Sequence, residues 1–107
     1  ELSEDDLVRI LTEPKNALVK QYKRMFEFEE SELTFTDESL RAIAREALEH
    51  GTGARGLRSI CERVLQNVMY DLPEHEGAST VVVRATDITG ETTPVIASIP
   101  EQPEMSV

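Results

Sequence analysis

The feature that most constrains the fold is a long amphipathic segment that follows a cluster of glycines. Its apolar residues recur at intervals of three and four, which is the spacing of one face of an α-helix. They are Leu57, Ile60, Cys61, Val64, Leu65, Val68 and Met69. The helix is expected to close at Leu72 and Pro73, because proline does not continue a helix. Such a stripe must be buried against other elements, and a chain of 107 residues has room for one modest core. We therefore expect a single domain packed around this helix.

Two shorter helices are predicted near the N-terminus. Ser3 and Asp6 have the spacing of a capping box, so a helix should begin there and stop near Thr12. Pro14 predicts the start of a second helix, because proline is tolerated in a first helical turn. Its apolar face is made of Ala17, Leu18, Tyr22, Met25 and Phe26.

A third helix and a small sheet complete the predicted fold. Thr36 is a good N-cap for the third helix, which should end at the glycine pair Gly51 and Gly53. Strand patterns occupy residues 32–36, 80–84 and, more weakly, 93–97, with a turn at residues 87–90 before the last. The predicted fold class is α+β, with four helices and a small two- to three-stranded sheet. Residues 1–97 form the domain, and residues 98–107 are predicted to be a disordered tail.

Charge and cysteine content disfavour several classes of protein. There are 21 acidic and 11 basic residues, for a formal charge of −10, which repels phosphate backbones and anionic lipids. The apolar runs are far shorter than the ~20 residues that cross a bilayer, and no secretory signal is expected. Cys61 alone forms neither an internal disulfide nor a metal site, and it is expected to be a small buried hydrophobe. His50 and His75 are isolated and are expected to bind no metal. We expect no nucleic-acid or membrane partner and a cytoplasmic location.

The glycine cluster contains the most informative polar residues. Residues 51–56 fit the letters of the G-x-G-x-x-G dinucleotide fingerprint, but that motif follows a strand and the segment before Gly51 is helical by period. Arg55 and Arg58 stand near the first turn of the long helix, where the helix dipole favours acidic residues. Two interpretations stay open from composition and spacing. The favoured one is that the arginines solvate the helix end or pair with surplus carboxylates, and the other is a phosphate-binding site.

Three stretches of the sequence resemble the ClpX family of AAA+ protein unfoldases. Residues 11–22 are similar to the opening of that family's small domain, residues 52–60 to its sensor-2 motif, and residues 68–73 to the end of its sensor-2 helix. The stretches follow the family's order and spacing, and the similarity extends over about residues 1–96. The resemblance identifies the chain as a C-terminal small (lid) AAA+ domain, with a sensor-2 helix at about residues 54–72.

The resemblance implies a hexameric, ATP-dependent unfoldase that delivers tagged protein substrates to the ClpP peptidase. In that family the small domain caps the nucleotide of its own large domain and packs on the large domain of the neighbouring subunit. Arg55 matches the sensor-2 arginine that reaches the ATP phosphates, which reverses the interpretation favoured above. Arg58 matches a further motif position, with a structural, intersubunit or nucleotide-binding role. Leu2 falls where the hinge enters, near the expected position of the adenine.

The catalytic parts of that family have no counterpart in this sequence. The Walker A and B motifs, the sensor-1 residue, the arginine finger, the pore loops and the ClpP-docking loop are all missing from the 107 residues. The resemblance implies ATP or ADP with Mg²⁺ in the full-length protein, bound by its large domain, and zinc only in an N-terminal domain. We expect no catalytic residue and no ATPase activity in this chain, because phosphoryl transfer needs those groups.

Three alternative functions remain open. The chain could belong to another Clp-type or HslU-type ring, since sensor-2 helices recur in that group. It could be a free-standing acidic helical adaptor that binds a partner helix, which would require a complete chain with its own start codon. It could be a helix-turn-helix DNA reader with Arg55 and Arg58 at the head of the second helix, although the net charge disfavours this function.

Overall fold

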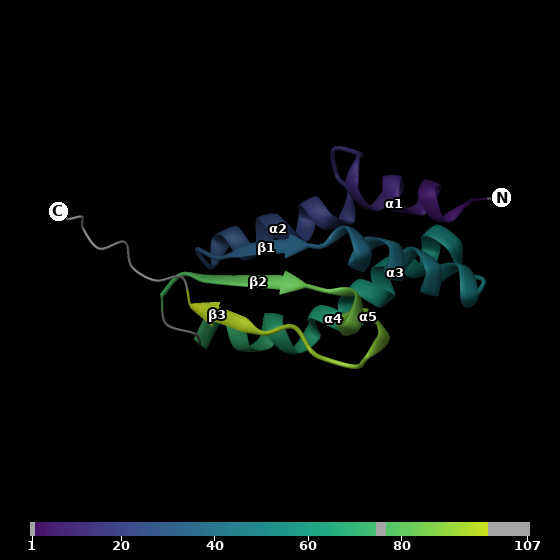
Figure 1. Cartoon of the computed structure of the whole chain (residues 1–107). Coiled ribbons are helices and arrows are strands. Elements are labelled where there is room, and N and C mark those ends of the chain that lie inside the picture. The colour runs from purple at the N-terminus through teal and green to yellow at the C-terminus, as the bar shows by residue number, and fades with distance from the viewer. Residues whose placement is uncertain (1, 75–76, 99–107) are drawn as a thin grey trace.

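The computed structural model describes residues 2–74 and 77–98, and it contains helices packed around a small sheet. The α-helices are α1 (Glu4–Thr12), α2 (Leu18–Phe28), α3 (Asp37–Glu49), α4 (Leu57–Asp71) and α5 (Ala85–Thr89). Two 3₁₀ helices, η1 (Gly53–Gly56) and η2 (Leu72–Glu74), flank α4. The strands are β1 (Glu32–Phe35), β2 (Ser79–Val83) and β3 (Ile96–Ser98). Figure 1 shows α1 and α3 at the end that contains the N-terminus, and the sheet beside α2 and α4.

The sheet joins segments that are distant in the sequence. Its strand order is β1-β2-β3, with β1 parallel and β3 antiparallel to β2. Leu33 pairs with Val81 and Phe35 with Val83, and all four side chains are buried. The parallel pair is connected through α3 and α4, because parallel strands need a long crossover. The predicted α+β class, with a sheet of two to three strands, is confirmed.

Local signals placed α1 and α3 correctly. Ser3 Oγ accepts a hydrogen bond from the Asp6 backbone N–H at 3.2 Å, and the Ser3 N–H donates to Asp6 Oδ2 at 3.0 Å, which completes the predicted capping box. Thr36 Oγ1 accepts from the Ser39 N–H at 3.0 Å and caps α3. The sensor-2 helix prediction at residues 54–72 corresponds to η1 followed by α4.

The predicted start of α2 was wrong. Pro14 lies in a turn, which is closed by a hydrogen bond from the Ala17 N–H to the Pro14 carbonyl at 2.9 Å, and the helix begins at Leu18. Lys20 Nζ donates to the Glu13 carbonyl at 3.1 Å and satisfies the end of α1 across this turn. The contact of Lys20 with Glu13 and the turn at Pro14 together favour a break between α1 and α2. Proline alone is also compatible with a first helical turn at this position.

A fifth helix replaces the turn predicted at residues 87–90. Asp87 Oδ2 accepts from the Arg84 backbone N–H at 2.8 Å, so α5 has its own N-terminal cap, and Gly90 ends it with φ +93°. The last strand begins at Ile96, later than predicted, and includes Ser98. The rest of the predicted tail, residues 99–107, lies outside the described residues.

One hydrophobic core runs through the described residues and includes α4 along its length. The largest of its fully buried apolar side chains come from six elements: Leu7, Leu11, Phe26, Ile43, Leu57, Leu65, Val81, Val83 and Ile88. Cys61 is 0% exposed and lies in the same cluster, as the sequence predicted. No helix in the described part of the chain has the length and apolar character to cross a bilayer.

The Cys61 thiol provides a probe of opening of the core. Burial raises its pKa to about 12, so the reactive thiolate is scarce as well as inaccessible. We expect the native chain to react with a thiol reagent at pH 8 on the order of 100-fold more slowly than the urea-unfolded chain, because only opened molecules expose the sulfur. The measurement is the rate of Ellman's reaction with and without urea. Equal rates would contradict the described packing of α4.

Candidate functional site

The α3–α4 turn, residues 50–56, is shaped by two glycines in the left-handed region. Gly51 has φ +70° and Gly53 has φ +56°. The Gly51 N–H donates to the Leu48 carbonyl and the Thr52 N–H to the Ala47 carbonyl, both at 3.1 Å. This pair of bonds is the Schellman arrangement that satisfies the last carbonyls of a helix. The predicted end of α3 at Gly51 and Gly53 is therefore explained by backbone conformation.

Arg55 projects from η1, which forms the second half of this turn. It is exposed, and it makes no hydrogen bond or ion pair with any residue in the described part of the chain. Arg63 and Arg41 differ from it, since Arg63 pairs with Glu46 at 2.6 Å and Arg41 with Asp5 at 2.7 Å. No pairing of Arg55 with a carboxylate is seen among the described residues, and its guanidinium is solvated at the head of α4. Its guanidinium is available to an anion from outside the described residues.

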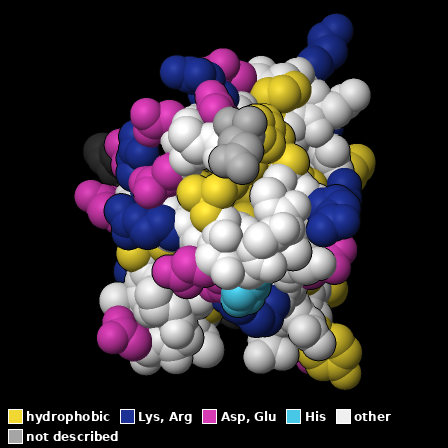
Figure 2. Space-filling model, turned by 90° about the vertical axis from the view of Figure 1, so that its right-hand side faces the viewer, with side chains coloured by type: hydrophobic (Ala, Val, Ile, Leu, Met, Phe, Trp, Pro, Cys, Tyr) yellow, Lys and Arg dark blue, Asp and Glu magenta, His cyan; other side chains and the backbone are white. Residues whose placement is uncertain are grey.

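Leu2 lies beside the α3–α4 turn. A shallow cavity of about 340 Å³ is lined by Leu2, Leu48, Gly51, Thr52 and Gly53. Leu2 is 45% exposed and Leu48 is 40% exposed, so both present apolar surface to this cavity. Figure 2 looks onto the end of the molecule where the N-terminus lies, and hydrophobic side chains gather there with charged side chains around them. The structure thus brings Leu2 close to the turn that contains Arg55.

Ion pairs hold α1 against α3 next to this cavity. Arg41 Nη1 contacts Glu4 Oε2 at 3.0 Å and Asp5 Oδ1 at 2.7 Å, and Arg45 Nε contacts Glu4 Oε1 at 3.2 Å. The hydrogen bond from Arg41 is the main reason that the pKa of Glu4 is lowered. Because α1 follows Leu2 and the turn follows α3, these contacts help to fix the two parts of the candidate site relative to each other.

Arg58 lies apart from this site. Its Nη2 donates to Gln21 Oε1 at 3.4 Å, and it lines a groove of about 450 Å³ between α2 and α4. The other lining residues are Tyr22, Met25, Glu62, Gln66 and Met69. Arg58 and Leu2 line different cavities. Of the predicted site residues, Arg55 and Leu2 are therefore associated with the same turn, and Arg58 contacts α2.

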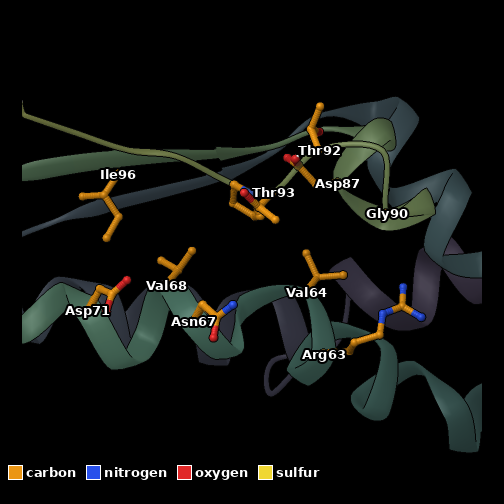
Figure 3. Close-up of a pocket in the computed structure, with 11 residues that line it drawn as sticks. Arg63, Val64, Asn67, Val68, Asp71, Asp87, Gly90, Thr92, Thr93 and Ile96 are labelled. Carbon is orange, nitrogen blue, oxygen red and sulfur yellow. Dashed lines mark hydrogen bonds between the residues drawn. The ribbon is translucent and has the colours of Figure 1, made fainter.

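A further cavity, of about 640 Å³, was not predicted from the sequence. The cavity lies between α4 on one side and α5 with the segment leading to β3 on the other. Figure 3 shows Val64 and Val68 pointing from α4 toward the side where Ile96 lies. Its charged lining residues are largely engaged: Arg63 binds Glu46 and the Ile88 carbonyl. Among the sequence signals, the apolar stripe of the long helix reaches this cavity, through Val64 and Val68.

No group of three or more histidine, cysteine or acidic side chains suitable for a metal ion occurs among residues 2–74 and 77–98. His50 is exposed at the C-cap of α3, where its backbone N–H donates to the Glu46 carbonyl at 3.0 Å. His75, the other isolated histidine, lies outside the described residues.

Comparison with known proteins gives the family of the chain. Residues 2–83 match the family described as the C-terminal, D2-small domain, of ClpB protein. The chain is 46% identical over 90 residues to the ATP-dependent Clp protease ATP-binding subunit ClpX 3 of Methylococcus capsulatus, which covers 84% of this chain and 21% of that protein. It is 41% identical over 83 residues to the corresponding ClpX of Treponema denticola, covering 78% of this chain and 20% of that protein. The chain spans about a fifth of the length of these curated relatives.

Proposed function

This chain belongs to the family of C-terminal D2-small domains of ClpB protein, as a ClpX-like small AAA+ domain, and from that premise we propose that it caps a nucleotide bound by a large AAA+ domain of the same protein. The observation that carries the proposal is the exposed guanidinium of Arg55, which has no partner among the described residues and lies at the turn beside Leu2. In this role Arg55 contacts the phosphates, and Leu2 contributes apolar surface near the base.

The chemistry of Arg55 suits a phosphate ligand. A guanidinium offers several N–H donors in a planar fork that matches phosphate oxygens, and it stays charged at any physiological pH. Among the described residues Arg55 has no hydrogen bond or ion pair, so binding to a phosphate costs it no contact there.

The remaining nucleotide contacts belong to the large domain. The chain has no G-x-x-x-x-G-K-[ST] loop, so ATP or ADP with Mg²⁺ would be cradled by that domain, while Arg55 is the residue here that fits the phosphates. When bound, the nucleotide and its Mg²⁺ supply the phosphoryl-transfer chemistry. The chain by itself is expected to have no ATPase activity. We place zinc, as the resemblance implies, only in a separate N-terminal domain.

The mechanical role follows from the single core. α1 and α3 are joined by ion pairs, and α3 and α4 by Arg63 and Glu46, so the small domain is suited to move as a rigid unit when the nucleotide changes. We propose that it packs on the large domain of the neighbouring subunit in a cytoplasmic homohexamer, and that its movements drive unfolding of protein substrates. Delivery of these substrates to ClpP is the role proposed for the whole protein, since the relatives are named as ATP-binding subunits of Clp protease.

Nucleotide affinity tests the assignment of Arg55. In the full-length protein, Arg55→Ala is expected to weaken binding of ATP about tenfold, because a charge-assisted contact to phosphate is lost. Arg58→Ala is the matched control, since Arg58 contacts Gln21 in a different groove, and it is expected to leave the affinity within about twofold. The measurement is titration with a fluorescent ATP analogue. Equal weakening by both substitutions would contradict the separate assignment of Arg55, and no weakening by either would refute the proposed function.

A further inference from the structure

A close contact between Thr52 and Gly56 closes the turn that contains Arg55. A Cβ atom on Gly56 would lie 1.9 Å from Thr52 Oγ1 and 2.8 Å from Thr52 Cβ, so no side chain fits while Thr52 keeps its place. Gly56 has φ −85°, which any residue adopts. Glycine is therefore required at this position by the contact. Gly51 and Gly53 differ, because their φ angles are positive and nothing lies within 4 Å of an added Cβ.

Thr52 is itself fixed by the end of α3. Its backbone N–H donates to the Ala47 carbonyl at 3.1 Å, and its Oγ1 donates to the same carbonyl at 3.3 Å. Thr52 cannot turn away from Gly56 without losing the side-chain bond. On the other side of Gly56, Leu57 is 1% exposed and begins α4. The four-residue η1 is thus held between α3 and the buried start of α4.

The direction of the Arg55 side chain depends on this backbone arrangement. That side chain has no hydrogen bond or ion pair with the described residues, so the backbone of η1 alone sets where the guanidinium leaves the domain. We propose that Thr52 and Gly56 are positioning residues for Arg55, which fix the direction of its side chain toward the phosphates of a nucleotide. This inference rests on the proposed function of Arg55 and adds the two residues that make its placement rigid.

The test is a double-mutant cycle in the full-length protein, with the KM for ATP and kcat of ATP hydrolysis as readouts. Gly56→Ala is expected to raise the KM about tenfold, because a misplacement of about 1 Å at a site that binds by geometry has effects of this size. Combining it with Arg55→Ala is expected to give the KM of Arg55→Ala alone, within about twofold, since Gly56 acts through that side chain. Gly77→Ala is the matched control: it strains a backbone with φ +79° in another part of the chain, and the KM should stay unchanged.

Each outcome supports or overturns the inference. A wild-type KM for Gly56→Ala, or effects of Arg55→Ala and Gly56→Ala that multiply, would overturn it while leaving the role of Arg55 intact. If Arg55→Ala itself leaves KM and kcat unchanged, the proposed function fails and the inference fails with it. If thermal unfolding shows that Gly56→Ala does not fold, Thr52→Val replaces it in the cycle. Valine removes the side-chain hydrogen bond to the Ala47 carbonyl and has nearly the same volume as threonine. Thr52→Val is then expected to raise the KM in the same direction, and a wild-type KM would overturn the inference.

Discussion

Replacing Arg55 by alanine in the full-length protein is expected to lower the rate of ATP-driven unfolding of a tagged substrate about 10- to 100-fold, the usual range for coupling between a nucleotide and a distant motion. Arg55 is exposed and has no hydrogen bond or ion pair with residues 2–74 and 77–98, so its loss removes no such bond in that part of the domain. The substitution should therefore impair nucleotide sensing and leave the folding of the domain unchanged. The measurement is the rate of loss of fluorescence from a tagged fluorescent protein in the presence of ATP.

Two controls make this result specific. The melting temperature of Arg55→Ala should equal that of the wild-type protein, since surface substitutions without partners rarely change stability. Arg55→Lys should retain part of the activity, because lysine keeps the charge but loses the planar fork that matches phosphate. Wild-type unfolding by Arg55→Ala would show that Arg55 senses no nucleotide.

Replacing Asp87 by asparagine is expected to destabilise the chain by about 2–3 kcal/mol, the range for buried hydrogen bonds to a charged group. The Asp87 side chain is fully buried, and it accepts bonds from the Arg84 backbone N–H at 2.8 Å and Thr92 Oγ1 at 2.6 Å, together with the Arg84 guanidinium. An amide of the same shape places N–H groups against some of these donors. Urea unfolding of the two chains measures the difference. Asp5→Asn, which affects only a surface ion pair with Arg41, should change the urea midpoint little.

The pH dependence of the difference in unfolding free energy between wild type and Asp87→Asn gives a second check on the role of the Asp87 carboxylate. Burial alone would raise the pKa of Asp87, but hydrogen bonds from Thr92 and Arg84 outweigh it and hold the pKa below its ordinary value. A carboxyl with a depressed folded-state pKa contributes stability above its unfolded-state pKa of about 4, and the contribution is lost as the pH falls through the folded value. The gap between wild type and Asp87→Asn should therefore be constant near neutral pH and narrow below about pH 4. A gap that does not change with pH would show that the charge of Asp87 contributes nothing.

Features of the chain that depend on near neighbours were predictable from the sequence. The capping box of Ser3 and Asp6, the Thr36 cap and the glycine end of α3 are set by hydrogen bonds and backbone angles within a few residues. The apolar stripe of α4 follows from helical period, and it correctly placed Cys61 in the core. The predicted position of Arg55, after a glycine turn at the head of the long helix, depended on the same short-range signals.

Some local predictions failed because more than one conformation suited the same residues. Pro14 is compatible with a first helical turn and with a tight turn, and a hydrogen bond from Ala17 together with the reach of Lys20 to Glu13 favours the tight turn. At the other end of the chain, α5 forms where a simple turn was predicted, since Asp87 is buried and caps it. In both places the outcome depended on side-chain contacts whose strength the pattern alone does not reveal.

The sequence by itself determined α1, α3 and α4, the caps at Ser3 and Thr36 and the place of Arg55 at the head of α4, because these depend on residues a turn or two apart. Only the tertiary structure decided which distant segments meet. The parallel pairing of β1 with β2, the approach of Leu2 to the α3–α4 turn and the contact of Arg58 with Gln21 join residues far apart in the chain. Burial of several apolar faces in one core fixes these contacts, and no single segment encodes them. The close fit of Gly56 against Thr52 likewise became visible only once the turn was folded between α3 and α4.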